Sequence, residues 1–212
     1  MRQSLFKHSV SALKRLPIPE DALFLDVGCG SGDLIIRLTA EMDGKAIAID
    51  IDEEQLSELR GKVKKLGLME RIQVINDNFL DLDFKPGTFD VIWAEGALYH
   101  IGLEYSMKKC QELLKEGGFL VVHDSILVFL PFYENSCEYG FIKYSRLNIP
   151  PDLWPEHYYK PIMERLTDDE FMINMTALES KEREMLKRQA ENVLGNPRKY
   201  ETDFFILRKK KK

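Results

Sequence analysis

Short apolar runs alternate with longer amphipathic segments along the first 125 residues. Five runs are bounded by Gly, Asp or Pro and have the length and composition of buried strands. They cover residues 23–27, 46–49, 72–75, 89–93 and 119–122. The segments between them place apolar residues at helical spacing, as at Leu56, Leu59 and Val63, and end near a glycine such as Gly67. Alternating strands and helices predict an α/β fold, with a parallel sheet covered by helices on both faces.

Both ends of the chain depart from this alternation. Residues 4–15 predict an amphipathic helix that stops before Pro17, and we expect residues 1–20 to cap the domain. Residues 125–161 hold five of the nine prolines and nine of the 22 aromatic residues without a clean period, which indicates an inserted lid. From the end of this lid onwards the pattern predicts a helix at 155–166, a strand at 171–175, a solvent-exposed charged helix at 180–193 and a last strand at 204–207.

Composition narrows the class of protein. The 212 residues are 44% hydrophobic and 31% charged, which predicts a single domain over residues 1–212. The net charge of −5 argues against bulk electrostatic binding of nucleic acid. No signal-peptide core and no apolar run long enough for a membrane span is present, and the three cysteines share no disulfide or metal-ligand spacing. We expect a cytoplasmic protein without membrane association, and the sequence carries no signal for an oligomeric state.

A glycine-rich turn follows the first predicted strand, in the sequence DVGCGSGD at residues 26–33. Glycines in a strand-to-helix turn allow positive φ angles and let backbone amides approach a ligand. A dinucleotide fingerprint would need its third glycine at position 33, which is Asp33, and a nucleotide-hydrolase phosphate loop would need Gly-Lys-Ser/Thr after residue 31. The sequence therefore argues against NAD and against a nucleoside triphosphate.

Two acidic residues flank this turn and suggest the ligand. Asp26 precedes the loop and can attract an ammonium group, while Asp50 ends the second strand and can accept hydrogen bonds from both ribose hydroxyls. Ile51 then provides an apolar wall for a base. This pattern predicts a ligand with a cationic amino-acid end and a nucleoside end.

Four ordered motifs resemble the class I S-adenosylmethionine-dependent methyltransferases. They are residues 26–32, the third strand and adenine loop at 71–84, the fourth strand at 87–95, and the turn at 116–119 into the fifth strand. The resemblance covers roughly residues 22–125. It implies a Rossmann-like, doubly wound, seven-stranded, mostly parallel sheet, whose antiparallel last strand would be residues 204–207. The family often joins its last two strands by a short loop, whereas a charged helix intervenes here.

The resemblance also implies S-adenosylmethionine as cofactor and S-adenosylhomocysteine as its product. In the first half of the chain it assigns cofactor binding to Asp26, Gly28, Cys29, Gly30, Gly32, Asp50 and Ile51. The adenine loop adds Asp77, Asn78 and Phe79, where either Asp77 or Asn78 would meet the adenine amino group. Glu95, at the end of the fourth strand, would contact the donor through its backbone carbonyl.

Tyr99 and His100 follow the fourth strand, where the family places the acceptor. His100 is similar in position to a histidine that some small-molecule N-methyltransferases use to orient or deprotonate the acceptor. Tyr99 and His100 are accordingly the candidate catalytic residues, and the alternative is that they only shape the pocket.

Two further groups of polar and aromatic residues have open interpretations. His123 and Asp124 end the fifth strand and suggest pocket polarity rather than a metal, because no third ligand has a fitting spacing, so we expect no metal site. His157, Tyr158 and Tyr159 belong either to a packed lid or to an aromatic cage for a cation or a planar substrate. The basic tail at 208–212 is either a solvated terminus or a contact for RNA or an anionic surface.

These observations predict methyl transfer to a small-molecule acceptor in a pocket closed by the N-terminal helix and residues 125–161. The alternative keeps the cofactor and makes the acceptor a protein or an RNA. The acidic charge and the absence of the Asn-Pro-Pro-Tyr type of signature argue against it. A third hypothesis is a catalytically idle binding module, which would be favoured by a damaged Asp26 or Asp50, and both are intact.

Overall fold

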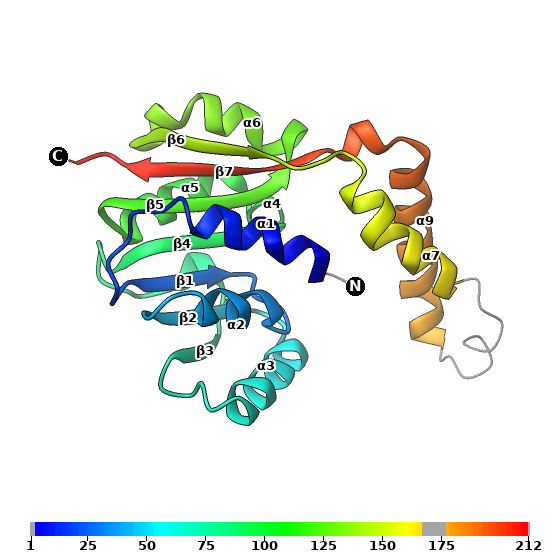
Figure 1. Cartoon of the computed structure of the whole chain (residues 1–212), viewed down its shortest axis with the longest axis horizontal. Helices are drawn as coiled ribbons and strands as arrows, with labels where there is room; N and C mark the ends of the chain where they lie inside the picture. The colour runs from blue at the N-terminus through cyan, green and yellow to red at the C-terminus, as the bar shows by residue number, and fades with distance from the viewer. Residues whose placement is uncertain (1–2, 167–176, 212) are drawn as a thin grey trace.

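A seven-stranded sheet forms the centre of the computed structural model, which describes residues 3–166 and 177–211 (Figure 1). In spatial order the strands are β3 (Ile72–Asn76), β2 (Lys45–Asp50), β1 (Leu23–Val27), β4 (Phe89–Glu95), β5 (Leu114–Ser125), β7 (Thr202–Lys209) and β6 (Phe141–Asn148). Only β7 runs antiparallel to its neighbours β5 and β6, and the other pairs are parallel. The predicted Rossmann-like sheet with an antiparallel last strand is confirmed.

Alternate residues of the central strands face two separate apolar cores. Phe24 and Trp93 point to one core, and Leu25 and Ile92 to the other. The first core is covered by α1 (Gln3–Leu13), α2 (Asp33–Ala40) and α3 (Glu53–Lys65). The second is covered by the 3₁₀ turn η1 (Phe79–Asp81), α4 (Leu98–Ile101), α5 (Leu103–Leu113) and α6 (Ile126–Glu134), followed by η2 (Ser136–Tyr139). Helices therefore lie on both faces, as the sequence pattern predicts (Figure 1).

Residues 125–161 contain more regular structure than the sequence pattern indicates. They begin with α6, which carries Pro131 in its interior, and continue into β6, which the pattern did not predict. β6 lies at the edge of the sheet, and only Phe141 and Leu147 of its eight residues are buried. An edge strand with so few buried positions lacks the apolar alternation that identifies a strand. Residues 126–148 therefore belong to a covering helix and an edge strand that the sequence pattern did not identify.

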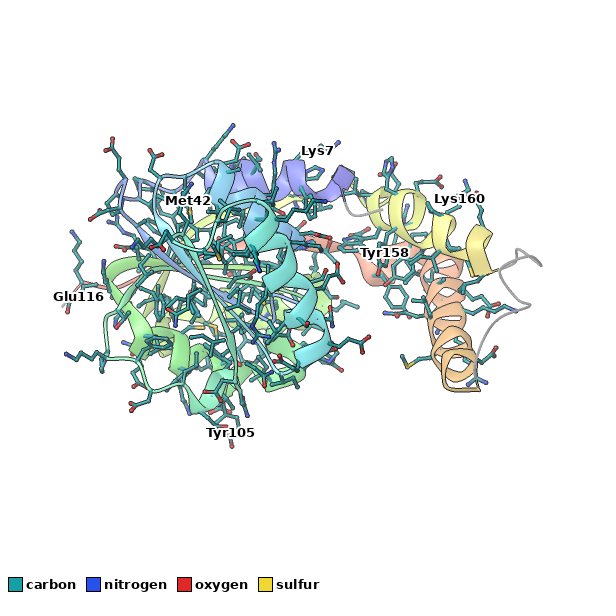
Figure 2. All side chains as sticks on the ribbon, turned by 90° about the horizontal axis from the view of Figure 1, so that it is seen from below. Lys7, Met42, Tyr105, Glu116, Tyr158 and Lys160 are labelled. Atoms are coloured by element: carbon teal, nitrogen blue, oxygen red, sulfur yellow. The ribbon has the colours of Figure 1, made fainter. Side chains whose placement is uncertain are left out.

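The segment between β6 and β7 forms an arm at the carboxyl ends of the parallel strands (Figure 1). It consists of the π-helical turn η3 (Pro155–Tyr159), α7 (Lys160–Leu166), α9 (Ala177–Gly195) and the 3₁₀ turn η4 (Pro197–Tyr200). Figure 2 shows Tyr158 at the base of the arm and Lys160 on α7. The predicted charged helix is confirmed as α9, although it buries Ala190 and Val193 as well as exposing a charged face. The predicted strand at 171–175 lies outside the described residues.

Three of the basic residues near the C-terminus, at 208–210, make hydrogen bonds to the rest of the domain. Arg208 and Lys209 belong to β7, and they donate to the carbonyl oxygens of Gly117 at 3.0 Å and Leu114 at 2.7 Å. Lys210 Nζ donates to the Cys137 carbonyl at 3.3 Å. None of the helices within 3–166 and 177–211 is both long enough and apolar enough to cross a membrane.

Asp203 joins β6 to β7 through a buried carboxylate. Its side chain is 1% exposed and accepts hydrogen bonds from Arg146 Nε at 2.6 Å, Asn148 Nδ2 at 3.1 Å and the Ile149 amide at 3.0 Å. A buried carboxylate is stabilising only when such donors replace its lost hydration. The three contacts fix the point where the chain leaves β6 for the arm.

We predict that Asp203→Ala lowers the free energy of unfolding by about 3–5 kcal/mol, because it leaves the partly buried Arg146 guanidinium without its partner. Urea denaturation followed by circular dichroism measures this change. The matched control is Glu134→Ala, which removes an ion pair to Lys143 between half-exposed side chains and should cost less than about 1 kcal/mol. Equal losses in the two variants would contradict the anchoring role of Asp203.

Candidate active site

A pocket of about 780 Å³ opens at the carboxyl ends of β1, β4 and β5. The strand order reverses between β1 and β4, and ligands of open α/β sheets bind at such a point. Eight of the residues that the sequence analysis assigns to cofactor binding or catalysis line this pocket, namely Asp26, Gly28, Cys29, Gly30, Gly32, Glu95, Tyr99 and His100. Residues that are far apart in the sequence therefore meet at one site.

The turn between β1 and α2 needs glycine for two reasons. Gly28 and Gly32 have φ angles of 70° and 77°, in the left-handed region that disfavours side chains. A Cβ on Gly28 would lie 2.5 Å from Cβ of Ala97, and a Cβ on Gly32 would lie 2.0 Å from Cδ1 of Leu59. The loop therefore runs against its neighbours with its backbone exposed to the pocket.

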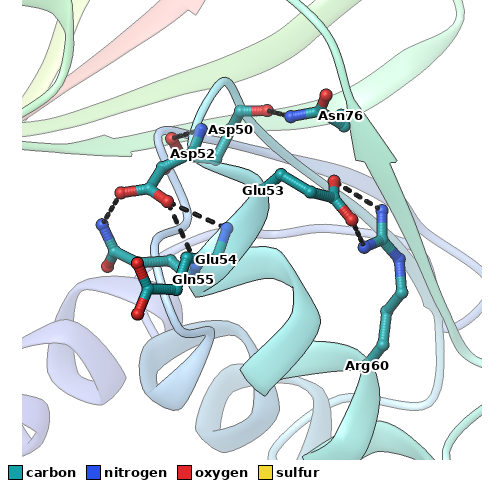
Figure 3. A network of polar contacts seen from close by, with 7 residues as sticks. All are labelled: Asp50, Asp52, Glu53, Glu54, Gln55, Arg60 and Asn76. Atoms are coloured by element: carbon teal, nitrogen blue, oxygen red, sulfur yellow. Dashed lines mark hydrogen bonds and ion pairs between the residues drawn. The ribbon is translucent and has the colours of Figure 1, made fainter.

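Asp50 holds the loops that follow β1 and β2 together. Its carboxylate accepts from the Gly30 amide at 2.8 Å and from the Asp52 amide at 3.0 Å. Asp52 in turn caps α3 by accepting from the Glu54 and Gln55 amides (Figure 3). The Asp50 carbonyl also accepts from Asn76 Nδ2 at 3.2 Å. A carboxylate fixed in this way is preorganised to accept further hydrogen bonds from a ligand.

The residues assigned to the nucleoside end lie on open surface beside this network rather than in the pocket lining. Ile51 is 76% exposed, which is unusual for a large apolar side chain and leaves it free to contact a base. Asp77 and Asn78 are exposed and accept hydrogen bonds from the nearby amides of Asn78 and Leu80. Phe79 differs, because its side chain is 3% exposed and packs in the second core, so only its backbone can reach a ligand.

Asp26 presents a buried carboxylate to the pocket. The residue is 2% exposed, and within the described chain no group donates to its Oδ2 atom. Burial, together with the charges of Glu95 and Asp50, raises the pKa of Asp26 to about 8. A cationic group of a ligand would donate a hydrogen bond to Oδ2 and would balance the negative charge of an ionised Asp26. The amino-acid end of S-adenosylmethionine carries such a group.

Glu95 is held in a polar network that links both sides of the pocket. Its Oε1 atom accepts from Ser9 Oγ at 2.8 Å and from Trp93 Nε1 at 2.9 Å, and Oε2 faces His123 Nδ1 at 3.6 Å. Burial alone would raise the pKa of Glu95, but His123, Trp93 and Ser9 outweigh this effect and hold that pKa below its usual range. The Glu95 carboxylate is therefore ionised and already occupied by partners within the protein.

His123 continues this network towards the arm. Its Nε2 atom lies 2.9 Å from Thr202 Oγ1, which also accepts from Trp154 Nε1 at 2.8 Å. The imidazole ring stacks between Trp154 and Phe204, with ring centroids at 5.7 and 4.4 Å. These contacts fix Trp154 in the pocket wall.

The candidate catalytic residues lie on the short helix α4, directly after β4. Tyr99 and His100 both line the pocket, and their rings meet edge to face at 5.3 Å. Both residues are exposed, so an acceptor can reach them. Cys29 is a poor nucleophile, because burial raises the pKa of its thiol and keeps it protonated.

Several pocket residues were not among the candidates from the sequence. Phe6 comes from α1, Trp154 from the residue before η3, Gln189 from α9 and Tyr200 from η4, whereas Tyr159 of η3, a candidate for the lid or the aromatic cage, also lines the pocket. The sequence could have indicated Tyr200, because it lies just before the predicted antiparallel strand. The start of an antiparallel strand lies at the carboxyl edge of its parallel neighbours. Gln189 had none, since it is one polar residue in a charged helix.

Comparison with known proteins agrees with this geometry. Residues 24–118 match the family model of a methyltransferase domain. This central part of the chain is therefore similar to a methyltransferase domain. The unpartnered Asp26 carboxylate and the glycine loop fit S-adenosylmethionine as the cofactor.

Part of the chain is similar to curated proteins that are named as methyltransferases. Over 117 residues it is 28% identical to 27-O-demethylrifamycin SV methyltransferase of Amycolatopsis mediterranei, a match that covers 55% of this chain and 43% of the relative. The chain thus spans less than half the length of that curated relative.

Among solved structures, phosphoethanolamine N-methyltransferase 2 of Haemonchus contortus, in complex with phosphomonomethylethanolamine and S-adenosylhomocysteine, has a TM-score of 0.77 at 17% identity. That match covers 97% of this chain and 53% of the other. The [4+2]-cyclase SpnF has a TM-score of 0.79 at 15% identity, over 98% and 82% of the two chains. At these identities the likeness shows the fold alone, and the fold also carries chemistry other than methyl transfer.

We predict that the affinity for S-adenosylhomocysteine rises with pH and levels off above about pH 8. The ammonium of the ligand favours ionised Asp26, so binding must release the proton that Asp26 holds below its raised pKa, and affinity gains up to about tenfold per pH unit. By the same linkage, the contribution of neutral Asp26 to the stability of the free protein is full in acid and is lost as pH rises through about 8. Titration calorimetry between about pH 6 and about pH 9 measures the affinity.

The matched variant is Asp26→Asn, which cannot ionise. It should bind S-adenosylhomocysteine weakly at every pH, with no rise. A wild-type affinity that stays constant over this range would contradict the assignment of Asp26 to the ammonium.

We also predict that Asp50→Ala weakens binding of S-adenosylhomocysteine by about 1–3 kcal/mol, since the ribose hydroxyls lose their charged acceptor. Calorimetry at one pH measures the loss. Asp52→Ala is the control, because it removes the cap of α3 and costs about 1 kcal/mol of stability without touching the ribose. If the affinity of Asp50→Ala matches that of the wild type, the ribose lies elsewhere.

Proposed function

We propose that this protein transfers a methyl group from S-adenosylmethionine to a small-molecule acceptor. The observation that carries the proposal is the pocket itself, which joins the glycine loop to a wall of aromatic side chains from four other elements, α1, α4, η3 and η4. A volume of about 780 Å³ lies within the range of small-molecule sites. The relative named for a demethylated rifamycin, which is a small-molecule acceptor, supports the same class of substrate.

Parts of α1 and of the 125–161 segment serve as the lid in this proposal. Phe6 reaches the pocket from α1, and Trp154 and Tyr159 reach it from the segment around η3. Gln189 extends the lid to α9. These side chains exclude water from the reacting groups, which strengthens the electrostatic contacts inside the pocket.

The reaction depends mainly on positioning. When bound, S-adenosylmethionine would supply a methyl group on a positively charged sulfur. This sulfur is the leaving group when a lone pair of the acceptor attacks the methyl carbon in line. The glycine loop, Asp26 and Asp50 hold the donor, and the lid holds the acceptor on the other side of the methyl group. Such positioning can contribute roughly 7–11 kcal/mol in favourable cases. His100 takes the acceptor's proton where the acceptor is an amine or a hydroxyl.

Transfer of a labelled methyl group into a cell extract of the source organism tests the proposal. The products are separated into metabolite, protein and RNA fractions. We expect label in the metabolite fraction. Label confined to protein or RNA would overturn the proposal in favour of a macromolecular acceptor, and no label in any fraction would favour an idle binding module.

We predict that His100→Ala lowers the rate of transfer to the labelled metabolite by about 10²–10⁴-fold, the usual contribution of a general base. The affinity for S-adenosylhomocysteine should stay within about twofold, because the proposed donor contacts lie on other residues. Single-turnover kinetics with the identified acceptor measures the rate. An unchanged rate would leave His100 as a residue that only shapes the pocket.

A further inference from the structure

We propose that the acceptor is an amine that arrives as a cation, and that the carboxylate of Asp124 binds it. This inference rests on the proposed function and names the substrate class for the same pocket. It assigns a second carboxylate, distinct from Asp26 and only partly buried, to the second ligand.

Asp124 has an unused oxygen at the pocket. It lies at the end of β5 and lines the cavity. Its Oδ1 atom accepts from the Ser125 amide at 2.7 Å, whereas Oδ2 is buried and has no donor among the described residues. Burial also raises the pKa of Asp124. A buried carboxylate oxygen without a donor is costly, so a ligand that donates to it gains binding energy.

The position of Asp124 separates it from the carboxylates that serve the donor. Side chains alternate along β5, so Val122 and Asp124 point to the face of the second core, which α4 covers. His123 points to the opposite face, with Glu95 and the network already described. His100 on α4 is close enough to lower the pKa of Asp124 electrostatically. Asp124 therefore belongs to the half of the pocket that holds the candidate catalytic residues.

Charge in the pocket favours a cation over an anion. The described lining contains the carboxylates of Asp26, Asp33, Glu95 and Asp124 but no Lys or Arg. Asp33 is paired with Lys62 at 2.5 Å, but the other three carboxylates have no Lys or Arg in the lining, so an anionic acceptor such as a carboxylate or a phosphate would meet like charge. The Glu95 carboxylate is occupied by Ser9, Trp93 and His123, which leaves Asp124 as the acceptor-side anion.

Aromatic faces complete the site for a cation. Tyr99 is 59% exposed and stands beside His100 in the lining, and Tyr159, Tyr200 and Trp154 line the same cavity. Ring faces attract ammonium groups, most strongly where water is excluded. The pocket thus offers a carboxylate and several rings to one positively charged group.

The chemical step balances with the residues at hand. An ammonium has no lone pair, so it first gives one proton to a ring nitrogen of His100. The free amine nitrogen then forms a bond to the methyl carbon, the carbon–sulfur bond breaks, and its electron pair stays on sulfur as a neutral thioether. The product is an N-methylated ammonium, which Asp124 can still hold.

The test combines labelled transfer into the extracted metabolites with charge separation of the product. After removal of the labelled donor, the products pass over a cation exchanger at about pH 5, where amines are protonated. The wild-type protein should give a labelled product that the cation exchanger retains. Asp124→Asn should lower kcat/KM for the acceptor of this labelled methyl group by about tenfold or more, mainly by raising KM. Its affinity for S-adenosylhomocysteine should stay within about twofold of the wild type.

The control variant is Asp152→Asn, which removes one exposed negative charge outside the pocket lining and should leave both kinetic constants unchanged. Retained S-adenosylhomocysteine affinity shows that Asp124→Asn is folded. A labelled metabolite that the cation exchanger does not retain would overturn the inference while the proposed function stands. An Asp124→Asn variant with wild-type kcat/KM would overturn the role of Asp124. Absence of any labelled metabolite would overturn the proposed function itself.

Discussion

The path of the chain between β1 and α2 constrains everything built around it. This turn crosses the point where the strand order reverses, and it approaches Ala97 on one side and Leu59 on the other so closely that a side chain at Gly28 or Gly32 would overlap them. The backbone amides are consequently exposed at the carboxyl edge of the sheet. The loops after β2, β4 and β5 assemble around this fixed turn, and Asp50 ties the turn to the start of α3.

The carboxylates around the pocket differ in what they have as partners. Glu95 is surrounded by donors from the protein, whereas Asp26 and Asp124 each keep one buried oxygen without a donor in the described chain. This contrast is informative because an isolated protein gains nothing from such oxygens. It distinguishes acids that support the structure from acids that await a ligand.

The parts of the fold that were predictable are those with strong burial. Strands β1, β2, β4 and β5 contain nearly continuous apolar runs because helices cover both of their faces. β3 lies at the other edge of the sheet with Ile72 buried, and it was found from its place in the regular alternation of strands and helices. β6 was missed because an edge strand with two buried residues has no such run. The glycine loop and Asp26 were found because strand ends meet at one edge of a parallel sheet. Phe6 and Gln189 were not, since their place in the pocket depends on how α1 and α9 dock, which periodicity does not encode.

The position of β7 also sets the order in which the molecule can be completed. This strand follows the arm in the sequence, yet it lies between β5 and β6 and is the only neighbour of β6 among the described strands. As the chain leaves the ribosome, β6 has no strand to pair with until the whole arm has been synthesised, and the same late segment brings Tyr200 and Thr202 to the pocket. Closure of the sheet and completion of the pocket are therefore a single late event, so a nascent chain without β7 would have neither.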